Sequence, residues 1–245
     1  MKLLAFDTST DALSIAVSRD DGAASGLWQL QGAGGAQAST SLIAGVLELM
    51  RQSGLALQEL DAICFGSGPG SFTGLRTACA VAQGLAFGAN VPVLPVNSLL
   101  AVAEEARHSA LADQPRGQVS AMLDARMDEI YVAHLAFEGS SWSELQAAHL
   151  QRPENVQLAP SPLPQAAAGN VFAVYGERLQ GLGDSAPRIH ALPQATALLR
   201  LAPQLLAAGH AVPAAQALPT YVRDKVAQTT AERAAIKAAQ AAATP

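Results

Sequence analysis

Strand-like and helix-like segments alternate along the first 110 residues, and their order limits the fold more than any other feature of the sequence. Residues 3–6, Leu-Leu-Ala-Phe, are a short apolar run typical of a buried strand. Residues 12–18 and 27–30 are two further strand-like segments, joined by a turn at Asp20-Asp21-Gly22. The segments that follow are helices predicted at residues 39–52, 72–87 and 98–110 and strands predicted at 61–65 and 91–96. A hairpin followed by helix–strand units predicts an α/β fold, in which helices cover a mixed sheet.

The second half of the chain begins in a similar way. Strands are predicted at residues 119–123, 130–137 and 171–175, a Pro-rich surface segment at 159–164, and a helix at 194–208 that Pro203 interrupts. Thr229 and Glu232 have the spacing of a capping box and begin an Ala-rich C-terminal helix. We therefore predict two related lobes, residues 1–110 and a degenerate second lobe at 111–220. A C-terminal helical segment follows at residues 221–245. One arrangement that the sequence allows is that this segment packs against the first lobe.

Composition narrows the class of protein. Half of the residues are hydrophobic, only 14% are charged, and the net charge is −5. An acidic chain lacks the basic face that independent nucleic-acid binding needs, and a surface poor in charge suggests that a partner covers part of it. Two cysteines, no leader-like N-terminus and no long apolar run predict a soluble, cytoplasmic protein that does not bind a membrane.

A glycine-rich turn, Gly-Ser-Gly-Pro-Gly-Ser-Phe-Thr-Gly-Leu-Arg-Thr, occupies residues 66–77. It matches neither the P-loop nor the dinucleotide-binding pattern, because Leu75 and Thr73 stand where lysine and glycine are required. Two interpretations remain. The free N–H groups of the following helix could face an anion, or the glycines could let that helix pack closely on the sheet.

The end of the first strand allows a second, related hypothesis. Actin-like and sugar-kinase-like ATPases place an aspartate and small hydroxyl side chains there, near the nucleotide phosphates; the alternative is a simple Asx turn. The residues of this possible vestigial nucleotide crevice are Asp7, Thr8, Ser9, Gly68, Gly70 and Ser71.

Two helices of the first lobe are more apolar than surface helices usually are. No charged residue occurs between Arg76 and the strand at 91–96, and residues 39–52 carry apolar side chains on two adjacent sides. The helices either form a partner-binding face or are buried by the second lobe or the C-terminal helix. The residues predicted for a partner interface are Leu42, Ile43, Val46, Leu49, Met50, Arg76 and Ala80.

Catalytic and metal-binding patterns are not found in the sequence. The five histidines are scattered, with no pair four residues apart, and no Gly-x-Ser-x-Gly motif occurs. We therefore predict no catalytic residue and no metal site. The charged residues Asp124, Arg126, Asp128 and Glu129 are interpreted as the tip of a solvated turn.

Four stretches, AFDTST, GSGPGSFTGLRTACAVAQGLAF, LDARMDEIYVA and LPTYVRDKVA, resemble the TsaB (YeaZ) family in the right order along most of the chain. The resemblance implies a two-lobed fold of the actin, sugar-kinase and Hsp70 type. It also implies a role in forming threonylcarbamoyladenosine in tRNAs that read codons starting with A. In that family TsaB is a scaffold for the paralogue TsaD, which carries the metal and transfers the threonylcarbamoyl group, and the ATPase TsaE joins them.

The resemblance carries further expectations. These are a homodimer in isolation, contact with tRNA only through the complex, and no required cofactor, with weak ATP or ADP binding at the partner interface. The catalytic paralogue would have a His-x-x-x-His motif in a first-lobe helix, and residues 39–52 contain no histidine. Relatives often begin this helix with a His-Ser-Glu-like sequence, whereas this chain reads Ala38-Ser39-Thr40-Ser41, which leaves the polar contacts there open. The alternatives are an independent small-molecule kinase or ATPase of the same fold, and a metallopeptidase.

Overall fold

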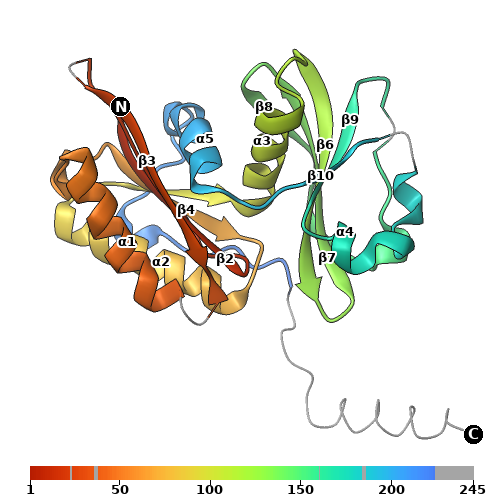
Figure 1. Ribbon diagram of the computed structural model, residues 1–245, viewed down its shortest axis with the longest axis horizontal. Coiled ribbons are helices and arrows are strands. Elements are labelled where there is room, and N and C mark those ends of the chain that lie inside the picture. The colour runs from red at the N-terminus through yellow and green to blue at the C-terminus, as the bar shows by residue number, and fades with distance from the viewer. Residues whose placement is uncertain (23, 36–37, 160, 184–185, 224–245) are drawn as a thin grey trace, which may run out of the picture.

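Two lobes, each built on a five-stranded sheet, form the computed structural model, which describes residues 1–22, 24–35, 38–159, 161–183 and 186–223 (Figure 1). The first sheet has the order β3-β2-β1-β4-β5, and its strands are β1 (Lys2–Asp7), β2 (Ala12–Asp20), β3 (Ser25–Ala33), β4 (Ala62–Gly68) and β5 (Val93–Asn97). The second has the order β10-β9-β6-β7-β8, and its strands are β6 (Arg116–Arg126), β7 (Glu129–Glu138), β8 (Ser141–Gln151), β9 (Gln165–Gly169) and β10 (Arg188–His190).

The two sheets share one topology. In each, the first three strands form an antiparallel meander, and the fourth and fifth run parallel to the first on its other side. Central strands are apolar on both faces: β1 is buried from Leu3 to Asp7, whereas the edge strand β3 alternates between half-buried and exposed residues. This repeated arrangement is the two-lobed fold of the actin and sugar-kinase type, which confirms the prediction.

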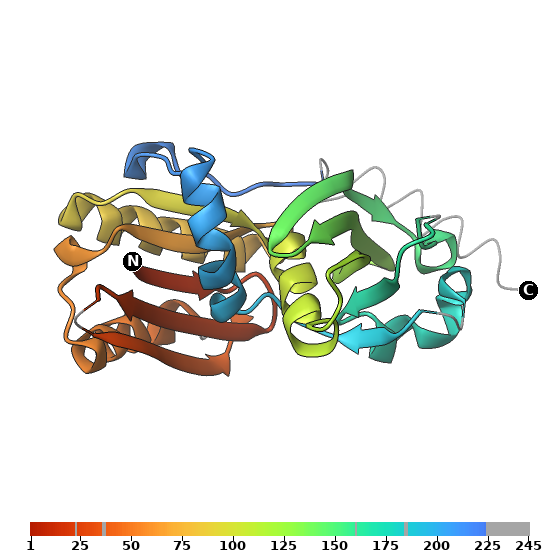
Figure 2. The same ribbon diagram turned by 90° about the horizontal axis from the view of Figure 1, so that it is seen from above.

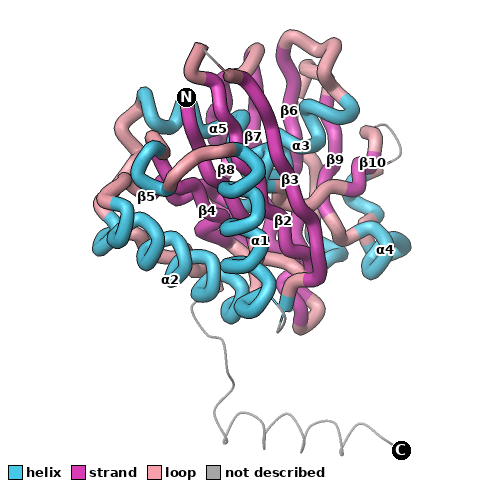
Figure 3. The backbone as a smooth tube through the Cα atoms, turned by 60° about the vertical axis from the view of Figure 1, so that its left-hand side comes forward, coloured by secondary structure: helices cyan, strands magenta, loops and turns pink. Residues whose placement is uncertain are grey.

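Two long helices cover one face of the first sheet. They are α1 (Ala38–Ser53) and α2 (Phe72–Ala89), which lie side by side in Figure 3. The Ser71 side chain caps the start of α2, and Asn90, in a left-handed conformation, ends it. Helix α5 (Ala195–Ala207) crosses the opposite face of the same sheet (Figure 2). The predicted second lobe, 111–220, therefore includes a helix that packs on the first sheet.

The second lobe is a reduced version of the first, as predicted. Among its described residues, the connection from β8 to β9 holds only the 3-10 helix η3 (Pro153–Asn155) where the first lobe has α1. The connection from β9 to β10 holds the one-turn helix α4 (Phe172–Tyr175) and two further 3-10 turns, η4 (Gly176–Arg178) and η5 (Gln180–Leu182), where the first lobe has α2.

Helix α3 (Ser98–Ala110) joins the lobes and packs against both α5 and the second sheet. A buried carboxylate anchors this junction. Glu104 accepts hydrogen bonds from Arg107 on its own helix, from Arg200 of α5 and from the indole of Trp142 in β8. Because one side chain ties three elements together, the lobes are fixed to each other on this side.

One strand of the second lobe was predicted at the wrong place, and another was missed. Residues 171–175 were predicted as a strand, but Phe172–Tyr175 is α4, and the strand that pairs with β6 is Gln165–Gly169. Alanine is a poor strand former, yet Ala166, Ala167 and Ala168 are fully buried between β6 and β10, so packing overrides propensity. The edge strand β8 was not predicted. The helix predicted to begin near Thr229 lies outside the described residues.

Candidate functional site

The glycine turn connects β4 to α2 and lies directly on the end of β1. The Ser71 N–H donates to the carbonyl oxygen of Ser9 at 2.7 Å, and the Thr8 hydroxyl donates to the carbonyl oxygen of Gly74 at 2.7 Å. A Cβ atom on Gly74 would lie 1.8 Å from the Thr8 carbonyl oxygen. The glycines therefore let the two backbone segments lie in direct contact.

The predicted crevice residues divide into two groups. Ser9, Gly70 and Ser71 line a cleft of about 400 Å³ between the lobes. Asp7 and Thr8 are buried, and Gly68 has a left-handed φ of 124° and contacts the backbone of Thr220. The hypothesis of nucleotide binding at this crevice remains a prediction.

Asp7 is the most unusual ionisable group of this region. One carboxylate oxygen, Oδ1, accepts from the Ser9 N–H at 2.8 Å and from the Ser9 hydroxyl at 2.7 Å. The other, Oδ2, is buried and has no hydrogen-bond partner among the described residues. Burial raises the pKa of Asp7 from 3.8 to about 6, although the bonds from Ser9 act in the opposite direction.

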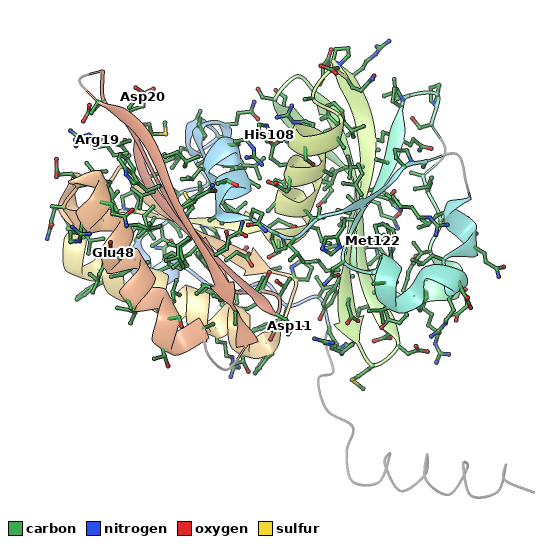
Figure 4. The ribbon with its side chains drawn as sticks, viewed as in Figure 1. Asp11, Arg19, Asp20, Glu48, His108 and Met122 are labelled. Atoms are coloured by element: carbon green, nitrogen blue, oxygen red, sulfur yellow. The ribbon has the colours of Figure 1, made fainter. Side chains whose placement is uncertain are left out.

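The charged tip of the β6–β7 hairpin faces the first lobe across the cleft. Its residue Arg126 forms ion pairs with Asp124 in its own lobe and with Asp11 in the first lobe (Figure 4 labels Asp11 where the two lobes meet). Asp128 pairs with Arg178. The tip is therefore more than the solvated turn that the sequence suggested, because it connects the lobes. Sequence reasoning missed this, since Asp11 and Arg126 are far apart in the chain.

The predicted interface residues do not form one surface. Leu42, Val46, Leu49 and Met50 are at most 5% exposed and belong to the core between the helices and the first sheet, so their assignment to a partner interface is wrong. Their apolar pattern marked the sheet-facing side of α1. Ile43, Arg76 and Ala80 are exposed, as a partner interface requires.

Further apolar and small residues are exposed beside these three. Leu47 on α1 is 55% exposed, and Phe87 on α2 is 82% exposed. The exposed side of α1 and α2 is called the helical face below. It consists of Ile43, Leu47, Arg76, Ala80, Gly84 and Phe87.

Histidine, cysteine and carboxylate side chains do not gather into a metal site. Within the described ranges, no group of three or more such residues could hold a metal ion. Likewise, no helix in that part of the chain is long and apolar enough to cross a bilayer.

Comparison with known proteins identifies the family. The family model described as TsaD, tRNA N6-adenosine threonylcarbamoyltransferase, matches residues 36–231. The protein named tRNA threonylcarbamoyladenosine biosynthesis protein TsaB from Haemophilus influenzae is 32% identical over 92% of this chain and 95% of its own length. The chain belongs to the TsaB family.

Other TsaB relatives agree with this assignment. The Escherichia coli protein of the same name is also 32% identical, over 93% of this chain and 96% of its own length. The solved structure of YeaZ from Pseudomonas aeruginosa superposes with a TM-score of 0.78 and 35% identity, over 90% of this chain and 99% of that one. The resemblance predicted from the four sequence stretches, and the fold it implied, are confirmed.

Proposed function

We propose that this chain is the non-catalytic subunit of threonylcarbamoyladenosine biosynthesis in tRNA, and that it pairs with a catalytic TsaD-like protein through the helical face. As a member of the TsaB family, the chain is a tRNA threonylcarbamoyladenosine biosynthesis protein. Its match to the TsaD family model supports a pair of related subunits.

The exposed apolar side chains of α1 and α2 carry this proposal. Water-exposed aromatic residues are enriched at protein interfaces, and Phe87 is 82% exposed. Next to it lie Ala80 and Gly84, whose small side chains would let a partner helix approach closely. Arg76 is the one charged residue of α2, so few charges would need to be desolvated on binding.

The remaining parts of the proposal come from the family resemblance. The TsaE ATPase would join the pair, tRNA would contact this chain only through the complex, and the complex would act in the cytoplasm. The chain itself would need no cofactor, and weak ATP or ADP binding would occur at the interface with the partner. In isolation, a second copy of the chain would cover the helical face.

Two matched substitutions test the interface. In Ile43→Glu/Leu47→Glu, both exposed α1 side chains become charged, and we expect pairing with the TsaD-like protein of the same cell to weaken at least tenfold. Leu145→Glu is the control, because Leu145 is 49% exposed on β8 of the second lobe. Affinity is measured by titration calorimetry, and circular dichroism checks that each variant is folded.

Equal binding by both variants would show that the helical face is not the interface. The biosynthetic role is tested separately, by measuring threonylcarbamoyladenosine in tRNA from cells depleted of this chain. Undiminished modification in those cells would contradict the proposed function.

A further inference from the structure

The last described segment of the chain, residues 218–223, runs from the first lobe to the second across the cleft. Upstream of it, the chain lies along α2: the Ala217 carbonyl oxygen accepts from the Gln83 side-chain amide at 2.8 Å. The Thr220 N–H then donates to the carbonyl oxygen of Ser67 at 2.7 Å. Gly68 makes this close passage possible, because a Cβ there would lie 2.4 Å from the Thr220 carbonyl oxygen.

The next residue is held by an aromatic cluster at the start of α2. The Tyr221 ring lies 5.2 Å from the Phe72 ring, centroid to centroid, and its hydroxyl accepts from Arg76 Nε at 3.0 Å. The Arg76 guanidinium itself lies over the Phe72 ring, 3.7 Å from its centroid. The segment is therefore attached firmly to the first lobe.

Arg223 makes the contact with the second lobe. Its Nη2 donates to Glu129 Oε2 at 2.6 Å and to the backbone carbonyl oxygen of Arg126 at 3.3 Å, and its side chain is only 13% exposed. A partly buried guanidinium with two acceptors holds its geometry better than an exposed ion pair does. Arg223 therefore contacts the β6–β7 hairpin tip, and Arg126 of the same tip forms an ion pair with Asp11 in the first lobe.

The hairpin tip has an uncommon backbone. Three consecutive residues other than glycine, Arg126, Met127 and Asp128, have left-handed φ values of 60°, 55° and 64°. Tight turns that join two antiparallel strands require such positive φ values at their central residues. Ion pairs link Arg126 to Asp11, Asp128 to Arg178 and Glu129 to Arg223, so this turn is also attached to the residues around it.

We propose that residues 218–223 are a clasp that locks the two lobes at a fixed opening, with the β6–β7 hairpin tip as the part of the second lobe that it grips. The lobes are already joined around Glu104 through α3 and α5. Two attachments at separate places prevent the hinge rotation that a single junction permits. The clasp thus makes the protein a rigid body that presents the helical face at one position relative to the second lobe.

Measuring the distance between the lobes tests whether they are held at a fixed opening. Spin labels are attached to cysteines introduced at Ser41 in α1 and Gln180 in η5, both exposed. The native Cys64 and Cys79 are buried, and the protein without added cysteines corrects for any labelling of them. We expect one narrow distance distribution in the otherwise wild-type chain, and a broader, longer one in Arg126→Ala/Arg223→Ala.

Arg19→Ala is the matched control, since Arg19 pairs with Asp21 inside the first lobe, and its distribution should equal that of the wild type. A broad distance distribution in the wild type would overturn the proposal. A double variant that folds and keeps the wild-type distance distribution would also overturn it. Where the double variant fails to fold, Glu129→Gln takes its place, because the Glu129 carboxylate accepts from Arg223 and its side chain is 36% exposed. Broadening in Glu129→Gln supports the clasp, and an unchanged distribution overturns it.

Discussion

Ser9 and Gly70 are in such close contact that a Cβ atom on Gly70 would lie 2.5 Å from the Ser9 carbonyl oxygen. The turn after β1 and the turn after β4 therefore pack directly against each other at the edge of the cleft. This relationship supports one of the two interpretations of the glycine-rich stretch, in which its glycines allow α2 to pack closely on the sheet. Anion binding at the start of α2 remains a prediction.

Adding a methyl group inside this contact should destabilise the fold. We expect Gly74→Ala to lower the free energy of unfolding by about 3 kcal/mol, because the new Cβ would overlap the Thr8 carbonyl and force the backbone apart. Gly84→Ala, in the same helix, has no atom within 4 Å of the new Cβ and should raise stability by about 0.5–1 kcal/mol. Urea denaturation measures both, and a Gly74→Ala variant as stable as the wild type would contradict the packing argument.

The sequence predicted the first lobe better than the second for physical reasons. Helix 98–110 was predicted with the observed bounds, and the structure shows that the Asn97 side chain caps its first turn. β8 lacks such a signal: its burial pattern shows no regular alternation of buried and exposed residues, because it is an edge strand with two irregularities in its pairing to β7. Contacts between distant residues, such as Asp11 with Arg126, leave no local pattern in the sequence.

The interface prediction from α1 was partly wrong because apolar residues occur on two sides of that helix. Sequence periodicity marks both sides equally and does not say which one faces the sheet. The structure separates them: Leu42 is 0% exposed and Leu47 is 55% exposed.

These two leucines should respond in opposite ways to truncation. Leu42→Ala is expected to cost about 2–5 kcal/mol of stability, because it leaves a cavity under α1. Leu47→Ala should change stability by less than about 0.5 kcal/mol but weaken pairing, because Leu47 lies on the helical face. Denaturation curves and titration with the TsaD-like protein separate the two effects. A stability loss at Leu47 equal to that at Leu42 would contradict the assignment.

The junction between the lobes should depend on Glu104. Glu104→Gln removes the charge that Arg107 and Arg200 share, and we expect a loss of about 3 kcal/mol, as for other buried ion pairs that lose one partner. Glu105→Gln is the control: its carboxylate is 25% exposed and should contribute under about 1 kcal/mol. Thermal unfolding compares the stability of the two variants. Equal losses would show that the burial of Glu104 does not determine how much it contributes to stability.

Acid should weaken the same junction. Burial alone would raise the pKa of Glu104, but the hydrogen bonds from Arg107, Trp142 and Arg200 outweigh it, and the net pKa is lowered. A carboxyl group with a lowered folded pKa stabilises the protein above its unfolded pKa and loses that effect as the pH falls. The stability difference between wild type and Glu104→Gln should therefore shrink toward low pH.

Asp7 should have the opposite pH dependence. Its pKa rises from 3.8 to about 6 on folding, chiefly because burial disfavours the charged form. Between these two values the folded state binds more protons than the unfolded state, so stability falls as the pH rises through this range. The shift of about two units corresponds to a penalty of up to about 3 kcal/mol at neutral pH.

Replacing the charge should remove that penalty. In Asp7→Asn the amide oxygen can still accept from Ser9, and an uncharged amide nitrogen takes the place of the unpaired Oδ2. We expect Asp7→Asn to exceed the wild type in stability by up to about 3 kcal/mol at pH 8 and to differ little from it at pH 4. Urea titrations at both pH values measure this, with the exposed Asp20→Asn as control. If Asp7→Asn differed from the wild type in stability by the same amount at both pH values, the effect would come from packing. Folding would then not disfavour the ionised form of Asp7.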